Sequence, residues 1–147
     1  MKVAIGADHG GFRLKGAIVE HLNAQGHEVI DFGTHSAESV DYPDIAFDVA
    51  QSVVRGEVSR GILVCGTGLG ISIAANKVPG IIAAPVSDTF SAEMARRHNN
   101  ANILALGERV IGVGLALKIV DTFLAAEFEG GRHQNRVEKI RRIEENR

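Results

Sequence analysis

Five short apolar segments alternate with helical patterns along almost the whole chain, and this alternation limits the fold more than any other feature. The segments are uninterrupted apolar runs, as expected for strands that are covered on both faces. They lie at 2–6, 28–31, 61–65, 81–86 and 103–105, and helical patterns fill 12–25, 42–55, 69–77, 89–98 and 112–126. The alternation predicts a three-layer α/β/α, Rossmann-like fold with a five-stranded parallel sheet.

The first two helices carry clear boundary signals. Gly26 follows the first helical stripe, where a helix commonly ends in a left-handed residue. Asp41 precedes the second helix as a candidate N-cap, with Pro43 in the first turn. Both signals support the predicted helix ends.

A last helix is expected at about 132–145, after the segment Glu-Gly-Gly-Arg, and no strand follows it. Its apolar residues Val137, Ile140 and Ile143 form a thin stripe at i, i+3 and i+6. We expect this helix to pack on a partner subunit. With 147 residues and no linker, the chain is predicted to be a single domain over 1–147.

Charge and composition exclude several classes of protein. The net charge is −2, which gives no global case for nucleic acid binding, and no apolar run approaches the ~20 residues that span a bilayer. From Arg132 onward there are six Lys/Arg and three Glu, so this tail suits an anionic ligand or partner. A single cysteine, no zinc spacing and no signal-peptide pattern predict a cytoplasmic protein without a metal.

Two glycine-rich loops mark the expected ligand site. In open parallel sheets, ligands bind beyond the carboxyl ends of the strands where the strand order reverses. If strands two and three flank strand one, the reversal falls between strands one and three. Beyond these two strands lie Gly-Ala-Asp-His-Gly-Gly (6–11) and Cys-Gly-Thr-Gly-Leu-Gly (65–70).

Cys65 is the only cysteine and ends the third strand directly before the second loop. The positive end of the following helix favours a thiolate, which can act as a base or nucleophile. The alternative is a small apolar residue that finishes a buried strand. The glycines of the loop suit an anion but also suit an ordinary tight turn, so position alone leaves both questions open.

Other polar residues have two interpretations each. Asp8 and His9 follow the first strand and could contact a hydroxyl or phosphate, although Asp8 could instead cap a helix. His98 ends the fourth helix, where capping is the simpler explanation. Arg132 and Arg136 share a helix face without acidic i±4 partners, as in a phosphate clamp or a solvated basic face. The remaining histidines are expected in surface or packing positions: His21, His27, His35 and His133.

Taken together, the segments ADHGGF, DYPD, CGTGLGISIAANK, RRHNNANILALGERV and EGGRHQNRV resemble the type B ribose-5-phosphate isomerases along nearly the full chain. The resemblance implies a cofactor-free and metal-free interconversion of ribose 5-phosphate and ribulose 5-phosphate through an enediolate. It also implies a homodimer or homotetramer with the active site at the subunit interface.

The resemblance assigns a role to each motif residue. Cys65 would move a proton between C1 and C2, and Thr67 with the amides of Gly66, Gly68, Leu69 and Gly70 would stabilise the enediolate. His98, helped by Asp8, would open the sugar ring. The phosphate would be held by His9, Arg132 and Arg136. Tyr42, Asn99 and Arg109 would complete the pocket, with part of 98–109 supplied by the partner subunit.

Two details refine the resemblance. In a second branch of the family, a glutamate six positions after the cysteine site is the base, but this chain has Ile71 there. The family commonly has arginine where this chain has Ile82, a change expected to affect packing or a surface ion pair rather than chemistry. Isomerisation of a six-carbon phosphate, such as allose 6-phosphate or galactose 6-phosphate, and sugar-phosphate binding without turnover remain alternative functions.

Overall fold

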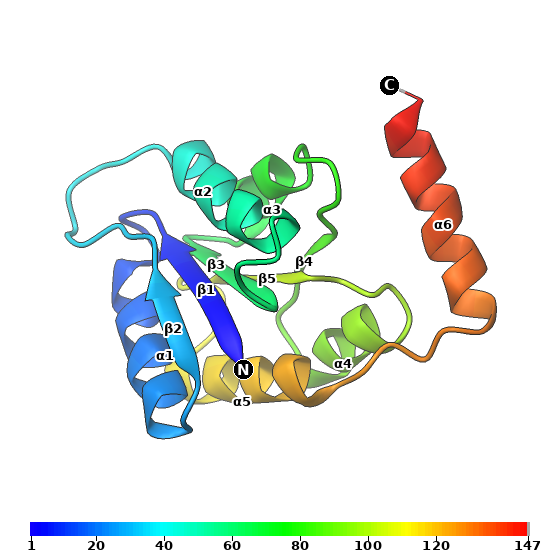
Figure 1. The fold of residues 1–147 in the computed structure, drawn as a ribbon. Helices are drawn as coiled ribbons and strands as arrows, with labels where there is room; N and C mark the ends of the chain where they lie inside the picture. Colours follow the sequence, from blue (N-terminus) through cyan, green and yellow to red (C-terminus); the bar gives the residue numbers. More distant parts are fainter. Residues whose placement is uncertain (147) are drawn as a thin grey trace.

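The five strands form one parallel sheet in the spatial order β2-β1-β3-β5-β4 (Figure 1). The structure is a computed structural model and describes residues 1–146. The strands are β1 (Lys2–Ala7), β2 (Glu28–Asp31), β3 (Arg60–Cys65), β4 (Ala83–Pro85) and β5 (Ile103–Gly107). Because β1 lies between β2 and β3, the predicted reversal of strand order between strands one and three is confirmed.

Helices cover both faces of the sheet and explain the uninterrupted apolar strands. Alternate residues of a strand enter opposite cores: Ile62 and Val64 pack on one face, Leu63 and Cys65 on the other. The first face is covered by α1 (Phe12–Ala24), α4 (Thr89–Arg97) and α5 (Val113–Ala125), and the second by α2 (Tyr42–Val54) and α3 (Leu69–Ala75). The three-layer α/β/α prediction is therefore confirmed.

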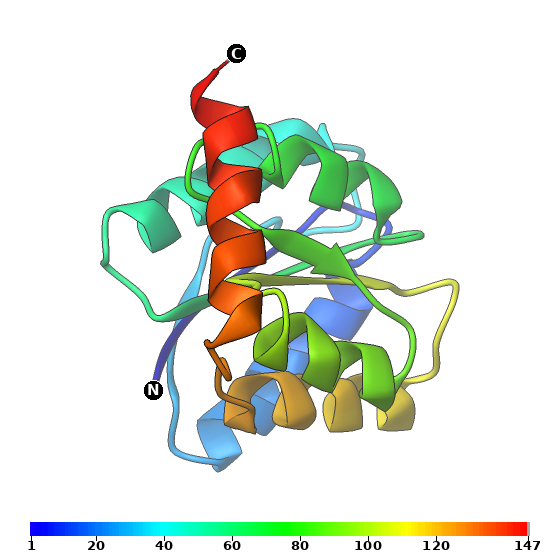
Figure 2. The same cartoon turned by 90° about the vertical axis from the view of Figure 1, so that its right-hand side faces the viewer.

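The last helix, α6 (Arg132–Glu145), stands apart from these layers (Figures 1 and 2). Only His133 and Val137 of this helix are buried, whereas Ile140 and Ile143 remain 48% and 72% exposed. Near its end, Glu144 Oε2 accepts a hydrogen bond from the Gly80 amide at 3.1 Å. Packing of the exposed stripe on a partner subunit stays a prediction.

Local boundaries differ from expectation where side chains take over backbone hydrogen bonds. The predicted strand at 81–86 is only Ala83–Pro85, since the Ile82 amide donates to Asn102 Oδ1 at 2.9 Å. Asp41 occupies the N-cap position of α2 but its side chain accepts no capping hydrogen bond. Gly26 has φ +84°, the left-handed conformation predicted there.

Within residues 1–146, every helix is too short or too polar to cross a membrane.

Candidate active site

The loops after β1 and β3 meet at the reversal point of the sheet. The Asp8 amide donates to the Val64 carbonyl at 3.2 Å, which ties the first loop to the end of β3. A Cβ on Gly10 would lie 3.1 Å from the Gly66 amide nitrogen, so the two loops are in backbone contact. The sequence prediction that these loops share one crevice is therefore confirmed.

Cys65 is buried at the end of β3, beneath the junction of the two loops, and its sulfur faces the glycine loop. The Gly68 amide donates to Cys65 Sγ at 3.1 Å. This hydrogen bond requires the chain to turn back over the sulfur, and Gly68 does so at φ +80°, in the left-handed region that favours glycine. An amide aimed at the sulfur stabilises a thiolate more than a neutral thiol.

Backbone packing fixes the position of this loop. A Cβ on Gly107 would lie 2.6 Å from the Thr67 carbonyl carbon, and a Cβ on Gly11 would lie 2.5 Å from the Val64 oxygen. Side chains are excluded at both positions, because no Cβ fits at such distances from another segment's backbone. The Thr67 side chain is exposed, and its Oγ1 accepts from the Leu69 amide at 3.2 Å.

Further predicted residues surround the same crevice. Asp8 is buried and accepts from the Gly10 amide at 2.9 Å, whereas His9 is exposed and its Nδ1 accepts from the Val40 amide at 3.2 Å. The Tyr42 ring lies over Gly70, where an added Cβ would come within 2.7 Å of Cζ. One chain therefore gathers most of the predicted crevice residues: Asp8, His9, Tyr42, Cys65, Gly66, Thr67, Gly68, Leu69 and Gly70.

Arg109 belongs to the crevice as well. A Cβ on Gly66 would lie 3.7 Å from Arg109 Cδ, and the Arg109 amide donates to the Gly66 carbonyl at 3.0 Å. Beside it, Thr67 and Leu69 line a surface hollow of about 290 Å³. Its other lining residues are Pro85, Val86, Ser87, Gly107 and Val110.

The other predicted residues lie at the opposite end of the sheet, where the parallel strands begin. His98 ends α4 and precedes β5, whose first residue Ile103 is paired with Gly61 near the start of β3. Cys65 ends β3, so at about 3.3 Å per residue the two ends are roughly 15 Å apart. Asn99, Arg132 and Arg136 are exposed on the His98 side, because α6 begins beside His98. A single chain does not unite these four residues with Cys65.

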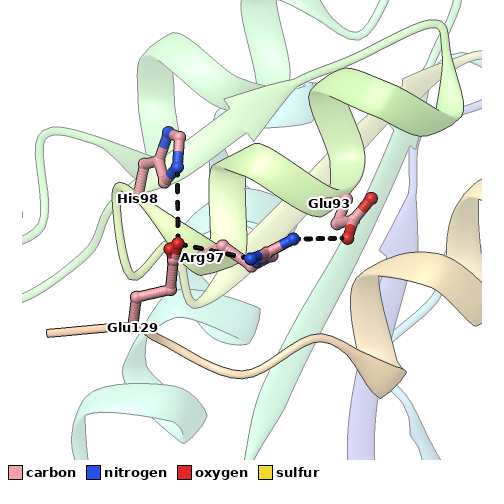
Figure 3. Close-up of polar contacts among 4 residues, drawn as sticks. All are labelled: Glu93, Arg97, His98 and Glu129. Carbon is pink, nitrogen blue, oxygen red and sulfur yellow. Dashed lines mark hydrogen bonds and ion pairs between the residues drawn. The ribbon is translucent and has the colours of Figure 1, made fainter.

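His98 is surrounded by residues that the sequence analysis did not single out. Its Nε2 lies 3.7 Å from Glu129 Oε1 (Figure 3). Its ring also stacks on His133, with centroids 4.1 Å apart and planes at 8°. The interpretation of His133 as an ordinary surface or packing residue is therefore incomplete. Desolvation, followed by the charges of His98 and Arg132, lowers the pKa of His133 below 6.5.

Arg96 fixes the turn that carries His98 and Asn99. It is buried, no carboxylate among residues 1–146 pairs with it, and its guanidinium donates to the Ala101 carbonyl at 2.6 Å and to Asn100 Oδ1 at 3.1 Å. Burial lowers the pKa of Arg96 to about 10. Asn100 adopts φ 52° in this turn. These contacts are local, but they depend on the turn that follows α4, so helical periodicity alone could not predict them.

The ligand atoms of His98, Glu129 and His133 lie within 4.8 Å of one another, which raises the question of a metal site. The two imidazole rings are nearly parallel and stacked. An imidazole lone pair lies in its ring plane, so an ion in the plane of one ring would lie outside the plane of the other. The observed arrangement therefore suits ring stacking better than coordination of one ion.

Comparison with known proteins adds to this geometry. Residues 3–140 match the family model described as Ribose/Galactose Isomerase. The chain belongs to this family. A ribose-5-phosphate isomerase B of Escherichia coli strain K12 is 57% identical over 146 residues, which cover 99% of this chain and 98% of the relative.

Solved structures of the ribose/galactose isomerase family share the whole fold. Ribose-5-phosphate isomerase B of Clostridium thermocellum superimposes with a TM-score of 0.98 at 63% identity, covering 99% of both chains. The Mycoplasma genitalium protein, solved with bound ribulose-5-phosphate, has a TM-score of 0.94 at 46% identity, covering 99% of this chain and 97% of that one. Ile82 is half-buried and packs against the apolar core on the first face of the sheet.

Proposed function

We propose that this protein interconverts ribose 5-phosphate and ribulose 5-phosphate, with Cys65 as the base. The observation that carries this proposal is the position of the Cys65 sulfur, which is buried at the reversal point of the sheet and accepts a hydrogen bond from the Gly68 amide. The chain that holds it belongs to the ribose/galactose isomerase family. A thiolate there takes the proton from C2 of the open-chain aldose and returns it to C1. The intermediate is an enediolate.

The loop amides and Thr67 stabilise the charge that develops on the enediolate oxygens. The amides of Gly66, Gly68, Leu69 and Gly70 face the enediolate. Without substrate, the Gly68 and Leu69 amides donate to Cys65 Sγ and Thr67 Oγ1, and they turn to the enediolate oxygens as the charge develops. Asp8 and His98 assist ring opening. His9, Arg132 and Arg136 hold the phosphate, while Tyr42, Asn99 and Arg109 shape the pocket.

A second copy of the chain completes this site. Helices α2 and α3 begin at the crevice and expose Phe47, Leu69 and Ile73, while α6 exposes Ile140 and Ile143 on its own stripe. If α6 of a partner covers α2 and α3, both apolar surfaces are buried, and His98, Asn99, Arg132 and Arg136 approach Cys65 from the partner. A two-fold axis makes two such sites at once. We therefore propose a homodimer, or a homotetramer built from such dimers, located in the cytoplasm.

The experiment that tests the function compares two substrates in the absence of metal. Purified protein is given ribose 5-phosphate and then allose 6-phosphate, and kcat/KM is measured for each. We expect the five-carbon substrate to be preferred. A higher kcat/KM for allose 6-phosphate would replace the proposal by a six-carbon isomerase. Failure to exchange the C2 hydrogen of bound sugar with solvent would indicate a binding protein without turnover.

A further inference from the structure

The side chain of Glu129 lies against His98 and is itself held in place from two directions. Its Oε1 accepts from Arg97 Nη2 at 3.3 Å, and its backbone amide donates to the Arg97 carbonyl at 3.0 Å (Figure 3). Arg97 is in turn fixed by Glu93, which accepts from Nη1 at 3.0 Å. These contacts place one carboxylate oxygen 3.7 Å from His98 Nε2.

The other face of His98 is constrained by His133. The two rings stack with centroids 4.1 Å apart, so His98 cannot turn about its side-chain bonds without losing this contact. Desolvation, followed by the charges of His98 and Arg132, lowers the pKa of His133, which favours its neutral form. A neutral ring can stack on a protonated His98 without repulsion between like charges. Arg132 and Arg136 are the nearest further cations on α6.

Ring opening requires a specific orientation of the His98 imidazole. The bond between C1 and the ring oxygen breaks, the ring oxygen takes a proton, and the C1 hydroxyl loses one as its electrons form the aldehyde. In the function proposed above, His98 supplies the first proton and Asp8 accepts the second. With the Glu129 carboxylate facing Nε2 at 3.7 Å, Nδ1 is the ring nitrogen left to face the sugar and donate.

We infer that Glu129 is a positioning residue for ring opening, which together with His133 holds the His98 ring with Nδ1 toward the sugar. This inference rests on the proposed function of His98. It assigns Glu129 no part in proton transfer between C1 and C2, because Cys65 carries that step at the opposite end of the sheet. Loss of the carboxylate should therefore affect cyclic and open-chain substrates differently.

The two steps can be measured separately, because ribulose 5-phosphate has no ring. Its O5 carries the phosphate and is not free to close onto the C2 carbonyl. Solvent deuterium uptake at C1 of ribulose 5-phosphate therefore reports the Cys65 step alone, whereas conversion of ribose 5-phosphate also requires ring opening. Both are measured by NMR for the wild type, Glu129→Gln, Glu129→Asp, His98→Asn and Glu127→Gln. Glu127 is an exposed glutamate on the same segment and is the matched control.

Glu129→Gln should lower kcat/KM for ribose 5-phosphate by about 10-fold or more, with deuterium uptake at C1 changed by less than about 2-fold. Glu129→Asp should recover part of the loss, and Glu127→Gln should match the wild type. Equal losses in both assays, or no loss in either, would overturn the role of Glu129 while leaving the isomerase intact. Full ribose 5-phosphate conversion by His98→Asn would instead overturn the proposed function of His98. Absence of deuterium uptake in the wild type would overturn the isomerase itself.

Discussion

The two halves of the candidate site are built in different ways. Around Cys65, backbone packs directly on backbone: the Gly107 and Thr67 segments leave no room for a side chain, and the sulfur is buried. Around His98, the structure depends on partly exposed side chains, with His98 and Glu129 retaining 37% and 34% of their side-chain exposure. A rigid, self-contained half suits the chemical step, and an exposed half suits presentation to a second copy.

The largest expected effect comes from removing the sulfur in the rigid half. Cys65→Ala should lower kcat by about 10²–10⁴-fold, because the general base is lost. Folding should be little affected, since a single buried sulfur is removed from an otherwise intact core. Turnover is measured with ribose 5-phosphate and folding by thermal unfolding. Near-wild-type turnover would contradict the assignment of the base.

In the exposed half, the expected effect falls on binding rather than on folding. Arg132→Ala combined with Arg136→Ala should raise KM about 10²-fold or more, because two charge-assisted hydrogen bonds to the phosphate are lost. Arg141→Ala combined with Arg142→Ala, on the same helix, is the control and should leave KM nearly unchanged. If both pairs raise KM equally, general positive charge on α6 is responsible rather than a phosphate clamp.

The smallest expected effect is on the free energy of unfolding, and it tests how tightly the backbone is packed in the rigid half. Gly107→Ala should lower the free energy of unfolding by about 1–3 kcal/mol, because its Cβ meets the Thr67 backbone. Gly16→Ala, in the interior of α1 with open space around it, should raise stability by about 0.5–1 kcal/mol. Urea unfolding measures both variants. A stability for Gly107→Ala equal to that of Gly16→Ala would refute the tight backbone packing of the rigid half.

The same contrast explains what the sequence could predict. Cys65 is the last residue of a buried strand and Asp8 directly follows another, so the strand pattern and the reversal rule were enough to place them close together. Glu129 and His133 reach His98 only because α4 and α6 meet in space, a contact that no local pattern encodes. Asp41 shows the same limit on a smaller scale. The local pattern placed it correctly at the N-cap of α2, but it did not predict that its side chain makes no capping hydrogen bond.

The central claim, that one chain supplies Cys65 and another supplies His98, is tested most directly by mixing two inactive variants. Cys65→Ala and His98→Asn proteins are unfolded, mixed in equal amounts, refolded together and assayed with ribose 5-phosphate. In a mixed dimer, one site has both wild-type residues and the other has neither. With random pairing, the mixture should therefore regain about a quarter of the wild-type activity. A mixture no more active than its two refolded parents would contradict a site shared between subunits.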